Sequence, residues 1–170
     1  MTAVFPAEDA GAIDRIRAPI RLHYQYTAGL THSLFLRGFA EGKILGRRCP
    51  QCRKVYVPAR GTCPICVSPM EEQVELSHKG TITKFCIVNL PFAGRHIEIP
   101  YVSASVLLDG ADVPIFHLVQ EIPYAEIRIG MRVEAVWAEP GDMRPSLETI
   151  KHFRPTGEPD APFDSYKDNL

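Results

Sequence analysis

Alternating hydrophobic and polar positions dominate the second half of the chain and predict β-strands. Between Tyr101 and Asp109, apolar residues occupy every second position, with Ser103 and Ser105 between them. This two-residue period is typical of a strand that buries one face. Four other short runs of β-branched, aromatic and apolar residues are separated from it by turns containing glycine, aspartate or proline. The five predicted strands are 80–90, 101–109, 113–120, 131–139 and 146–153.

Five short strands without a long helix between them match a small barrel of the OB type. The helix that normally separates the third and fourth OB strands has only residues 121–130 available, which leaves room for one turn at most. We therefore assign residues 73–153 to a five-stranded OB-fold domain. Residues 154–170 are acidic and proline-rich, and we expect them to form an extended tail that does not fold alone.

Residues 30–45 carry apolar side chains at helical spacing, which predicts a helix. Thr31 is in position to cap its start and Gly46 to end it. The apolar side chains face more than one side, so we expect this helix to pack against a partner chain. The predicted docking residues are Leu34, Phe35, Leu36 and Phe39. Alternation from Ile20 to Tyr26 predicts an extended arm before the helix, and residues 1–46 form this arm-and-helix segment.

Four of the five cysteines form a duplicated motif. Cys49 and Cys52 are spaced C-P-Q-C, and Cys63 and Cys66 follow after ten residues as C-P-I-C. Each pair places two thiolates on one tight turn, and the residues between suffice for a hairpin that brings the turns together. Four converging thiolates select zinc or iron and leave no open position for chemistry. We predict one structural zinc ion per chain, in a ribbon over residues 47–72; a dithiol redox pair or two disulfides are the alternatives.

The residue after the second cysteine of such a turn is usually glycine, because the backbone there tends to need a positive φ. Here the two positions hold Arg53 and Val67. A β-branched residue is poorly suited to a left-handed conformation. We therefore expect the second turn to be distorted or to close one residue later, at Ser68.

Composition and charge narrow the function classes. The 170 residues are 45% apolar and 23% charged, as in ordinary soluble globular proteins. A net charge of −1 argues against a nucleic-acid partner, since such domains usually carry a basic excess. No stretch approaches the ~18 apolar residues of a membrane span, and Met1–Ala12 lacks the basic segment of a secretory signal. We expect a cytoplasmic protein with reduced thiols.

Seven basic residues and one acid lie between Arg37 and Arg60. One interpretation is compensation, because zinc with four thiolates carries a charge of about −2 and attracts cations. The other is an anion site for a phosphorylated ligand. The candidate residues for this site are Arg47, Arg48, Arg53, Lys54 and Arg60.

No catalytic motif is present. The sequence has no nucleophile elbow, no phosphate-binding glycine loop and no zinc-protease motif. The six histidines lie in separate segments. The fifth cysteine, Cys86, sits in an apolar strand, so we expect a buried and unreactive thiol. The sequence therefore predicts a chain without catalytic residues of its own.

The ordered motifs of the chain resemble the DUF35 family. The segments GKILGRRCPQC (42–52) and VYVPARGTCPIC (55–66) look like its rubredoxin-like zinc ribbon. The segments GTITKF (80–85), IPYVSASVLLDG (99–110), IRIGMRVEAVW (127–137) and FRP (153–155) resemble its OB-fold, in the same order. The expected fold is therefore mainly β, with an N-terminal helix, a rubredoxin-like zinc ribbon and a five-stranded OB barrel.

This resemblance implies a non-catalytic accessory subunit. DUF35 proteins are typically small partners of thiolase-superfamily chains, including lipid-transfer-type thiolases and related aldolases. They support acyl-CoA binding while the partner cleaves or forms the carbon–carbon bond. The resemblance implies an acyl-CoA site shared with the partner, with CoA phosphates as the anion for the basic cluster. From the surplus apolar surface of the helix and the terminal segments, we expect them to wrap a thiolase-like dimer, which gives a heterotetramer with two copies of each chain.

Two alternatives remain. Zinc ribbons and OB barrels often bind single-stranded nucleic acid through stacked aromatics and a basic groove. The candidate stacking residues are Phe85, Tyr101, Phe116, Trp137 and Phe153; several of them must fill the core, and the net charge also disfavours this function. The second alternative is electron transfer through iron held by the four thiolates.

Overall fold

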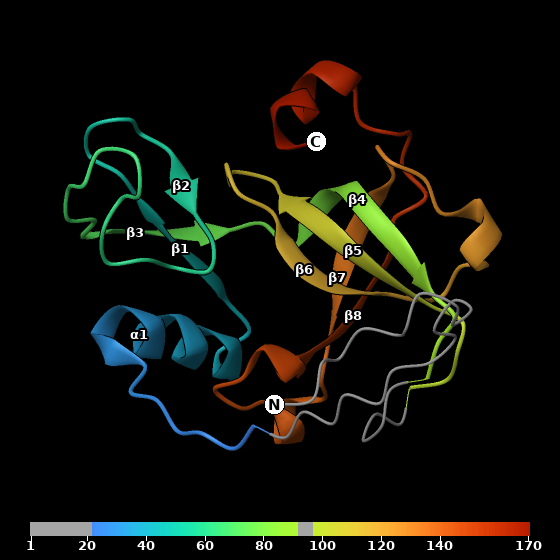
Figure 1. Ribbon diagram of the computed structural model, residues 1–170, viewed down its shortest axis with the longest axis horizontal. Coiled ribbons are helices and arrows are strands. Elements are labelled where there is room, and N and C mark those ends of the chain that lie inside the picture. The colour runs from blue at the N-terminus through green and yellow to red at the C-terminus, as the bar shows by residue number, and fades with distance from the viewer. Residues whose placement is uncertain (1–21, 92–96) are drawn as a thin grey trace, which may run out of the picture.

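The computed structural model describes residues 22–91 and 97–170. Its described part contains one α-helix, a three-stranded sheet and a closed five-stranded barrel. Figure 1 shows the helix and the small sheet together on one side and the barrel on the other. No helix in the described ranges is long and apolar enough to cross a lipid bilayer.

Helix α1 spans Gly29–Ala40, so the predicted helix over 30–45 is five residues too long. Its end is set by Gly42, whose φ of +71° is a left-handed conformation that glycine adopts freely. The predicted cap at Thr31 is also wrong, because Ala28 holds the N-cap position and no side chain caps the helix. Gly46 lies inside the strand that follows.

The ribbon is a three-stranded antiparallel sheet in the order β2-β1-β3. Strand β1 spans Ile44–Arg48, β2 spans Val55–Tyr56 and β3 spans Glu72–Leu76. The first residues of β1 were predicted to end the helix; Ile44 is instead fully buried in the core. The two cysteine turns lie between β1 and β3.

The barrel confirms the predicted OB topology, with strand order β4-β5-β6-β8-β7. Its strands are β4 (Lys79–Val88), β5 (Tyr101–Leu108), β6 (Ile115–Val119), β7 (Arg132–Trp137) and β8 (Ile150–Pro155). The alternating apolar residues of β5 point inward and are buried, as predicted. A single 3-10 turn, Tyr124–Glu126, stands where the OB helix would be.

A β-bulge in β4 overturns the prediction for Cys86. The pairing with β5 skips one residue between Ile82 and Lys84. A bulge of this kind shifts the alternation of every residue beyond it. Cys86 therefore pairs with Ser103 on the outward row of β5, and its thiol is exposed rather than buried.

The C-terminal segment differs from the predicted extended tail, because it folds back onto the barrel. Two 3-10 turns, Phe163–Ser165 and Lys167–Asn169, follow β8. Tyr166 is 8% exposed and lies over Gly130, where an added Cβ would be 3.0 Å from the tyrosine hydroxyl. Arg128 forms an ion pair with Asp160 at 2.6 Å. The acidic residues thus serve as anchors on the chain's own barrel.

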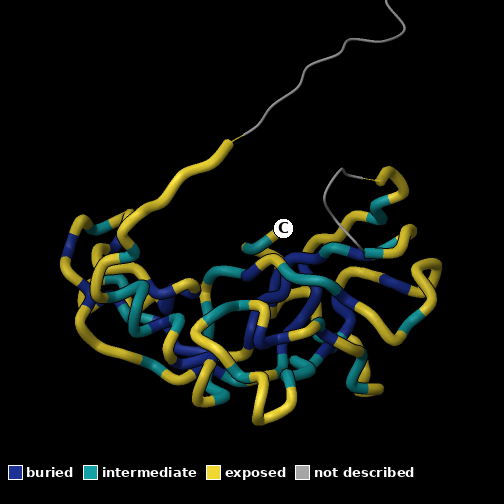
Figure 2. The backbone as a smooth tube through the Cα atoms, turned by 90° about the horizontal axis from the view of Figure 1, so that it is seen from below, coloured by how far each residue is buried: buried dark blue, intermediate teal, exposed yellow. Residues whose placement is uncertain are grey.

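The ribbon and the barrel are joined directly. The Val55 amide donates to the Asp112 carboxylate (2.8 Å), and the Asp112 amide donates to the Val55 carbonyl (2.9 Å). Helix α1 packs against the 3-10 turn Leu147–Thr149 that precedes β8. Figure 2 shows buried backbone running through the body of the molecule, while the described residues before α1 leave it as an exposed arm.

Candidate metal centre

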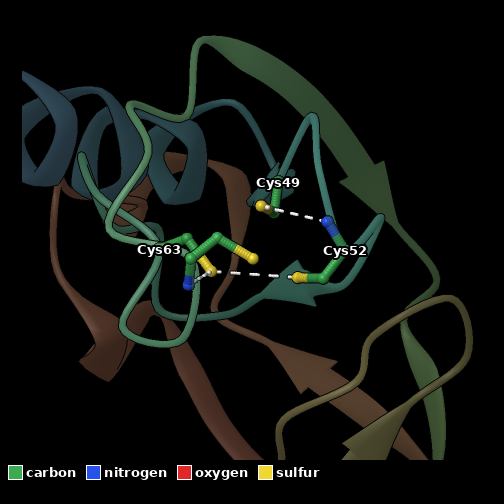
Figure 3. Close-up of side chains that lie close together, drawn as sticks. Cys49, Cys52 and Cys63 are labelled. Atoms are coloured by element: carbon green, nitrogen blue, oxygen red, sulfur yellow. Dashed lines mark hydrogen bonds between the residues drawn. The ribbon is translucent and has the colours of Figure 1, made fainter.

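The two cysteine turns bring all four predicted sulfur ligands together. Their Sγ atoms all lie within 4.8 Å of one another. Cys49 and Cys63 are fully buried, whereas Cys52 and Cys66 are partly exposed. Figure 3 shows Cys49, Cys52 and Cys63 converging from the two turns, with 3.8 Å between the sulfur atoms of Cys52 and Cys63. This constellation fits a structural metal ion with sulfur ligands.

Hydrogen bonds to sulfur follow the same pattern in both turns. The Cys52 amide lies 3.5 Å from Cys49 Sγ, and the Cys66 amide lies 3.4 Å from Cys63 Sγ. Such donors stabilise negative charge on sulfur. Ser68 Oγ adds a contact of 3.5 Å to Cys49 Sγ, and Tyr56 Oη one of 3.5 Å to Cys63 Sγ.

The thiols differ in how readily they ionise. Burial acts to raise the pKa of Cys49, but hydrogen bonds from Ser68 and neighbouring backbone amides outweigh it and lower the pKa to about 6. Burial and the adjacent thiols raise the pKa of Cys66 to about 12. The hydrogen bond to Cys63 raises the pKa of Tyr56, so that phenol remains a donor. A metal binds thiolates, and its binding releases the protons that remain.

Both cysteine turns close at the position where glycine is usual. The expectation that the second turn is distorted or closes one residue later, at Ser68, is therefore wrong. Arg53 has φ of +63° and Val67 has φ of +53°. Each amide donates to the carbonyl of the first cysteine of its turn, from Arg53 to Cys49 at 3.1 Å and from Val67 to Cys63 at 3.0 Å. Since the turn closes at Val67, Ser68 is free to place its hydroxyl beside Cys49.

Two of the five basic candidates are compensated by one acid, Glu72, that the sequence analysis did not consider. Arg48 and Arg53 both face Glu72, with nitrogen–oxygen distances of 3.4 and 3.5 Å. Arg47 donates to the backbone carbonyl of Glu71. The antiparallel register of β1 and β3 places Arg48 directly opposite Glu72. Of the five candidate anion ligands, Lys54 and Arg60 are exposed and form no ion pair within the described part of the chain.

The structure contradicts two of the four predicted docking residues. Phe35 and Phe39 are only 3% and 0% exposed, because α1 turns them into the chain's own core. Their rings pack edge to face, with centroids 4.9 Å apart. Leu34 and Leu36 are half-buried. The exposed apolar residues around α1 are Leu22, Tyr24, Tyr26 and Leu30, between 69% and 78% exposed.

The described histidines form no catalytic pair. His152 contacts Glu121 at 2.7 Å, and His78 accepts a hydrogen bond from the Trp137 indole at 3.2 Å. His117 lies edge to face on Phe153. Within residues 22–91 and 97–170, no histidine is hydrogen-bonded to a serine, threonine or cysteine side chain. His96 lies outside the described residues.

The family models that match this chain divide it into the same two parts as the structure, the ribbon and the barrel. A family model described as "ChsH2, rubredoxin-like zinc ribbon domain" matches residues 37–71. A second, described as "ChsH2, C-terminal OB-fold domain", matches residues 73–138. The first range contains the four clustered cysteines, and the second contains β4 to β7.

Curated relatives carry one common description, "DUF35 domain-containing scaffold protein". The protein from Methanocaldococcus jannaschii is 34% identical over 95 residues, which cover 55% of this chain and 67% of the relative. The protein from Pyrococcus furiosus is 34% identical over 105 residues, covering 61% and 76%.

Two solved structures share the architecture. A chain of the structure described as "Ltp2-ChsH2(DUF35) aldolase" has a TM-score of 0.57 and 25% identity, covering 73% of this chain and 93% of that chain. A DUF35-family protein of unknown function from Sulfolobus solfataricus has a TM-score of 0.56 and 18% identity, covering 75% and 84%. The second match supports the fold alone.

Proposed function

The chain belongs to the DUF35 family of zinc-ribbon and OB-fold proteins, and we propose that it is a non-catalytic scaffold subunit of a thiolase-superfamily complex. The observation that carries this proposal is the match to the Ltp2-ChsH2(DUF35) aldolase over 73% of the chain. The relatives described as scaffold proteins support it. The partner supplies the nucleophile and the base, and cleaves or forms the carbon–carbon bond of an acyl-CoA.

In this proposal the four cysteines bind one zinc ion, whose role is structural. The donor set is four sulfur atoms, two of them fully buried, which suits zinc and leaves no position for a substrate. The metal holds the two cysteine turns, and strand β3 that follows them, in place. Because the ligands must be reduced thiolates, we also propose a reducing compartment, the cytoplasm.

The arm and the start of α1 are the docking element for the partner. The side chains of Leu22, Tyr24 and Tyr26 are 76%, 78% and 69% exposed and touch little of this chain. Aromatic anchors of this kind dominate the energetics of protein interfaces. Phe35 and Phe39 act indirectly by fixing α1 to the core. We propose a heterotetramer with two copies of each chain and an acyl-CoA site shared between the subunits.

Co-purification tests this proposal. The tagged chain is co-expressed with the thiolase-superfamily chain from the same operon, and the complex is analysed by native mass spectrometry. Replacing Leu22, Tyr24 and Tyr26 by serine should abolish co-elution while leaving bound zinc unchanged. Phe163→Ser is the matched control, because Phe163 is 59% exposed on the C-terminal segment.

Two results would contradict the proposal. A wild-type chain that elutes alone has no thiolase-superfamily partner. A serine variant that retains its partner at full stoichiometry places the docking element elsewhere. The variant Phe39→Asp cannot serve here, because it puts a charge into a fully buried core position.

A further inference from the structure

A cleft opens on the outside of the barrel between β6 and the connection that leads into β8. Its volume is about 470 Å³, within the range of small-molecule sites. The barrel is least continuous here, because β6 and β8 share one registered pair, Val119 with Phe153. The cleft is separate from the metal centre and from the basic cluster of the ribbon.

One wall of the cleft is an exposed aromatic ring. Phe116 is 70% exposed on the outward row of β6. Its neighbour across β5 is Ser105, and the next outward residue of β5 is Ser103. Because the ring itself is largely exposed, a flat ligand can stack on it. Base–aromatic stacking of this kind is how OB barrels hold nucleotide rings.

Two lysines on this outer face of the barrel lack acidic partners. Lys151 lines the cleft, and Lys84 lies in the same row of the sheet as Ser105 and Phe116. Among the described residues no carboxylate lies within 4.0 Å of either ammonium group, in contrast to Arg48 and Arg53 of the ribbon. Adjacent strands are about 4.8 Å apart, so Lys84, two strands from Phe116 and outside the cleft, is too far away, and Lys151 is the cation within reach of a ligand on the ring.

Two further polar groups of the cleft can accept a hydrogen bond. Glu148 lies on the rim opposite β6, and Ser103 contributes a hydroxyl. A carboxylate there repels a phosphate but accepts a hydrogen bond from an exocyclic amine. His117 and Leu118 complete the inner wall. The cleft therefore combines a stacking face, an amine acceptor and one lysine without an acidic partner.

We propose that this cleft binds an adenosine phosphate, with the base on Phe116, its amino group toward Glu148 and its phosphate toward Lys151. Free nucleotides and the nucleotide end of CoA share this chemistry. The assignment to CoA rests on the proposed function; the nucleotide site itself does not. In this proposal the phosphate contact lies on the barrel and not on the ribbon cluster, where Arg48 and Arg53 already face Glu72.

Binding is measured by calorimetry on the full-length, zinc-loaded chain with AMP, CoA and 4′-phosphopantetheine. AMP and CoA should bind competitively, and phosphopantetheine, which lacks the base, should bind at least about tenfold more weakly. Phe116→Ala should weaken AMP and CoA by about tenfold. Lys151→Gln should weaken both and reduce the salt dependence of binding. Zinc content and thermal unfolding verify that each variant is folded.

Two controls match these variants. Phe163→Ala removes another exposed aromatic ring, 59% exposed against 70% for Phe116, and Lys54→Gln removes an exposed lysine of the ribbon. Neither should change AMP binding. Loss of CoA binding in the Lys54 variant, with the Phe116 variant unaffected, would overturn the proposal in favour of the ribbon cluster.

Other results would also overturn it: no AMP binding at millimolar concentration, equal affinity for phosphopantetheine, or an oligonucleotide that binds far more tightly than AMP and depends on Phe116. The last result makes the cleft a single-strand surface. Co-elution of the Phe116 variant with the thiolase-like chain is recorded in parallel. A chain that binds AMP through Phe116 without such a partner refutes the proposed function and leaves the nucleotide site standing.

Discussion

Replacing Val67 by glycine should tighten zinc binding, although it removes an apolar side chain. Val67 is 79% exposed, so little packing is lost, and its φ of +53° is unfavourable for a residue with a Cβ. A left-handed conformation costs roughly 1–2 kcal/mol for an L-residue. Glycine offsets part of this gain, because it loses about 0.5–1 kcal/mol more conformational entropy on folding. The expected net gain is about 0.5–1 kcal/mol.

The gain appears in metal affinity because ribbon folding and metal binding are coupled. A net gain of about 0.5–1 kcal/mol corresponds to a two- to fivefold tighter zinc dissociation constant. Competition with a chromophoric chelator at fixed pH measures this constant. Ile65→Gly is the control: Ile65 lies in the same turn, is 64% exposed and has no positive φ. It should weaken zinc binding slightly. Equal effects of the two substitutions would refute the reasoning, since the backbone conformation of Val67 would then carry no cost.

Four further predictions concern the site and the barrel. Cys63→Ser should release the metal and loosen residues 47–72 while the barrel stays largely folded; zinc analysis and hydrogen exchange check this, and retained zinc contradicts it. The purified chain should show no thiolase, aldolase or hydrolase turnover of acyl-CoA, and turnover lost in Cys86→Ala would show that the exposed thiol is a nucleophile. Tyr166→Ala should destabilise the barrel by about 2–3 kcal/mol, which is below the range for a fully buried aromatic residue because Tyr166 lies at the surface. An unchanged denaturation midpoint would mean that the C-terminal segment contributes nothing to the stability of the barrel. Burial lowers the pKa of His117 below its ordinary 6.5, so the unfolded chain binds more protons than the folded chain at acidic pH. The contribution of His117 to stability should therefore be complete above pH 6.5 and be lost as pH falls through the lowered pKa. His117→Gln should remove this contribution, and an identical pH profile of stability for both proteins would contradict it.

The strands and the cysteine cluster were predictable because local spacing determines both. In β5 the two-residue alternation places Val102 and Ala104 on the inner face of the barrel, and this does not depend on the neighbouring strands. The spacing of Cys49 and Cys52 likewise fixes two sulfur atoms on one turn. Such features depend on residues a few positions apart, and the fold leaves them unchanged.

The errors arose where distant segments or one special residue decide the outcome. The bulge between Ile82 and Lys84 reverses the facing of Cys86, and alternation alone does not reveal it. The compensation of Arg48 depends on a strand 24 residues later in the sequence, which the register of β1 and β3 brings opposite it. The helix end could have been found, because Gly42 is a recognisable stop; the apolar spacing of Ile44 and Leu45 favoured the longer helix.

The packing of α1 on the turn before β8 has a geometric consequence. That turn carries Glu148 on one rim of the barrel cleft, and the arm ends where α1 begins. The reciprocal hydrogen bonds of Asp112 and Val55 hold the ribbon to the barrel at a second place. With two attachments the orientation of the ribbon relative to the barrel is fixed, whereas a single attachment would allow the ribbon to rotate. A partner protein that binds the arm and α1 therefore always faces the same side of the barrel. The distance between that partner and the cleft is then constant.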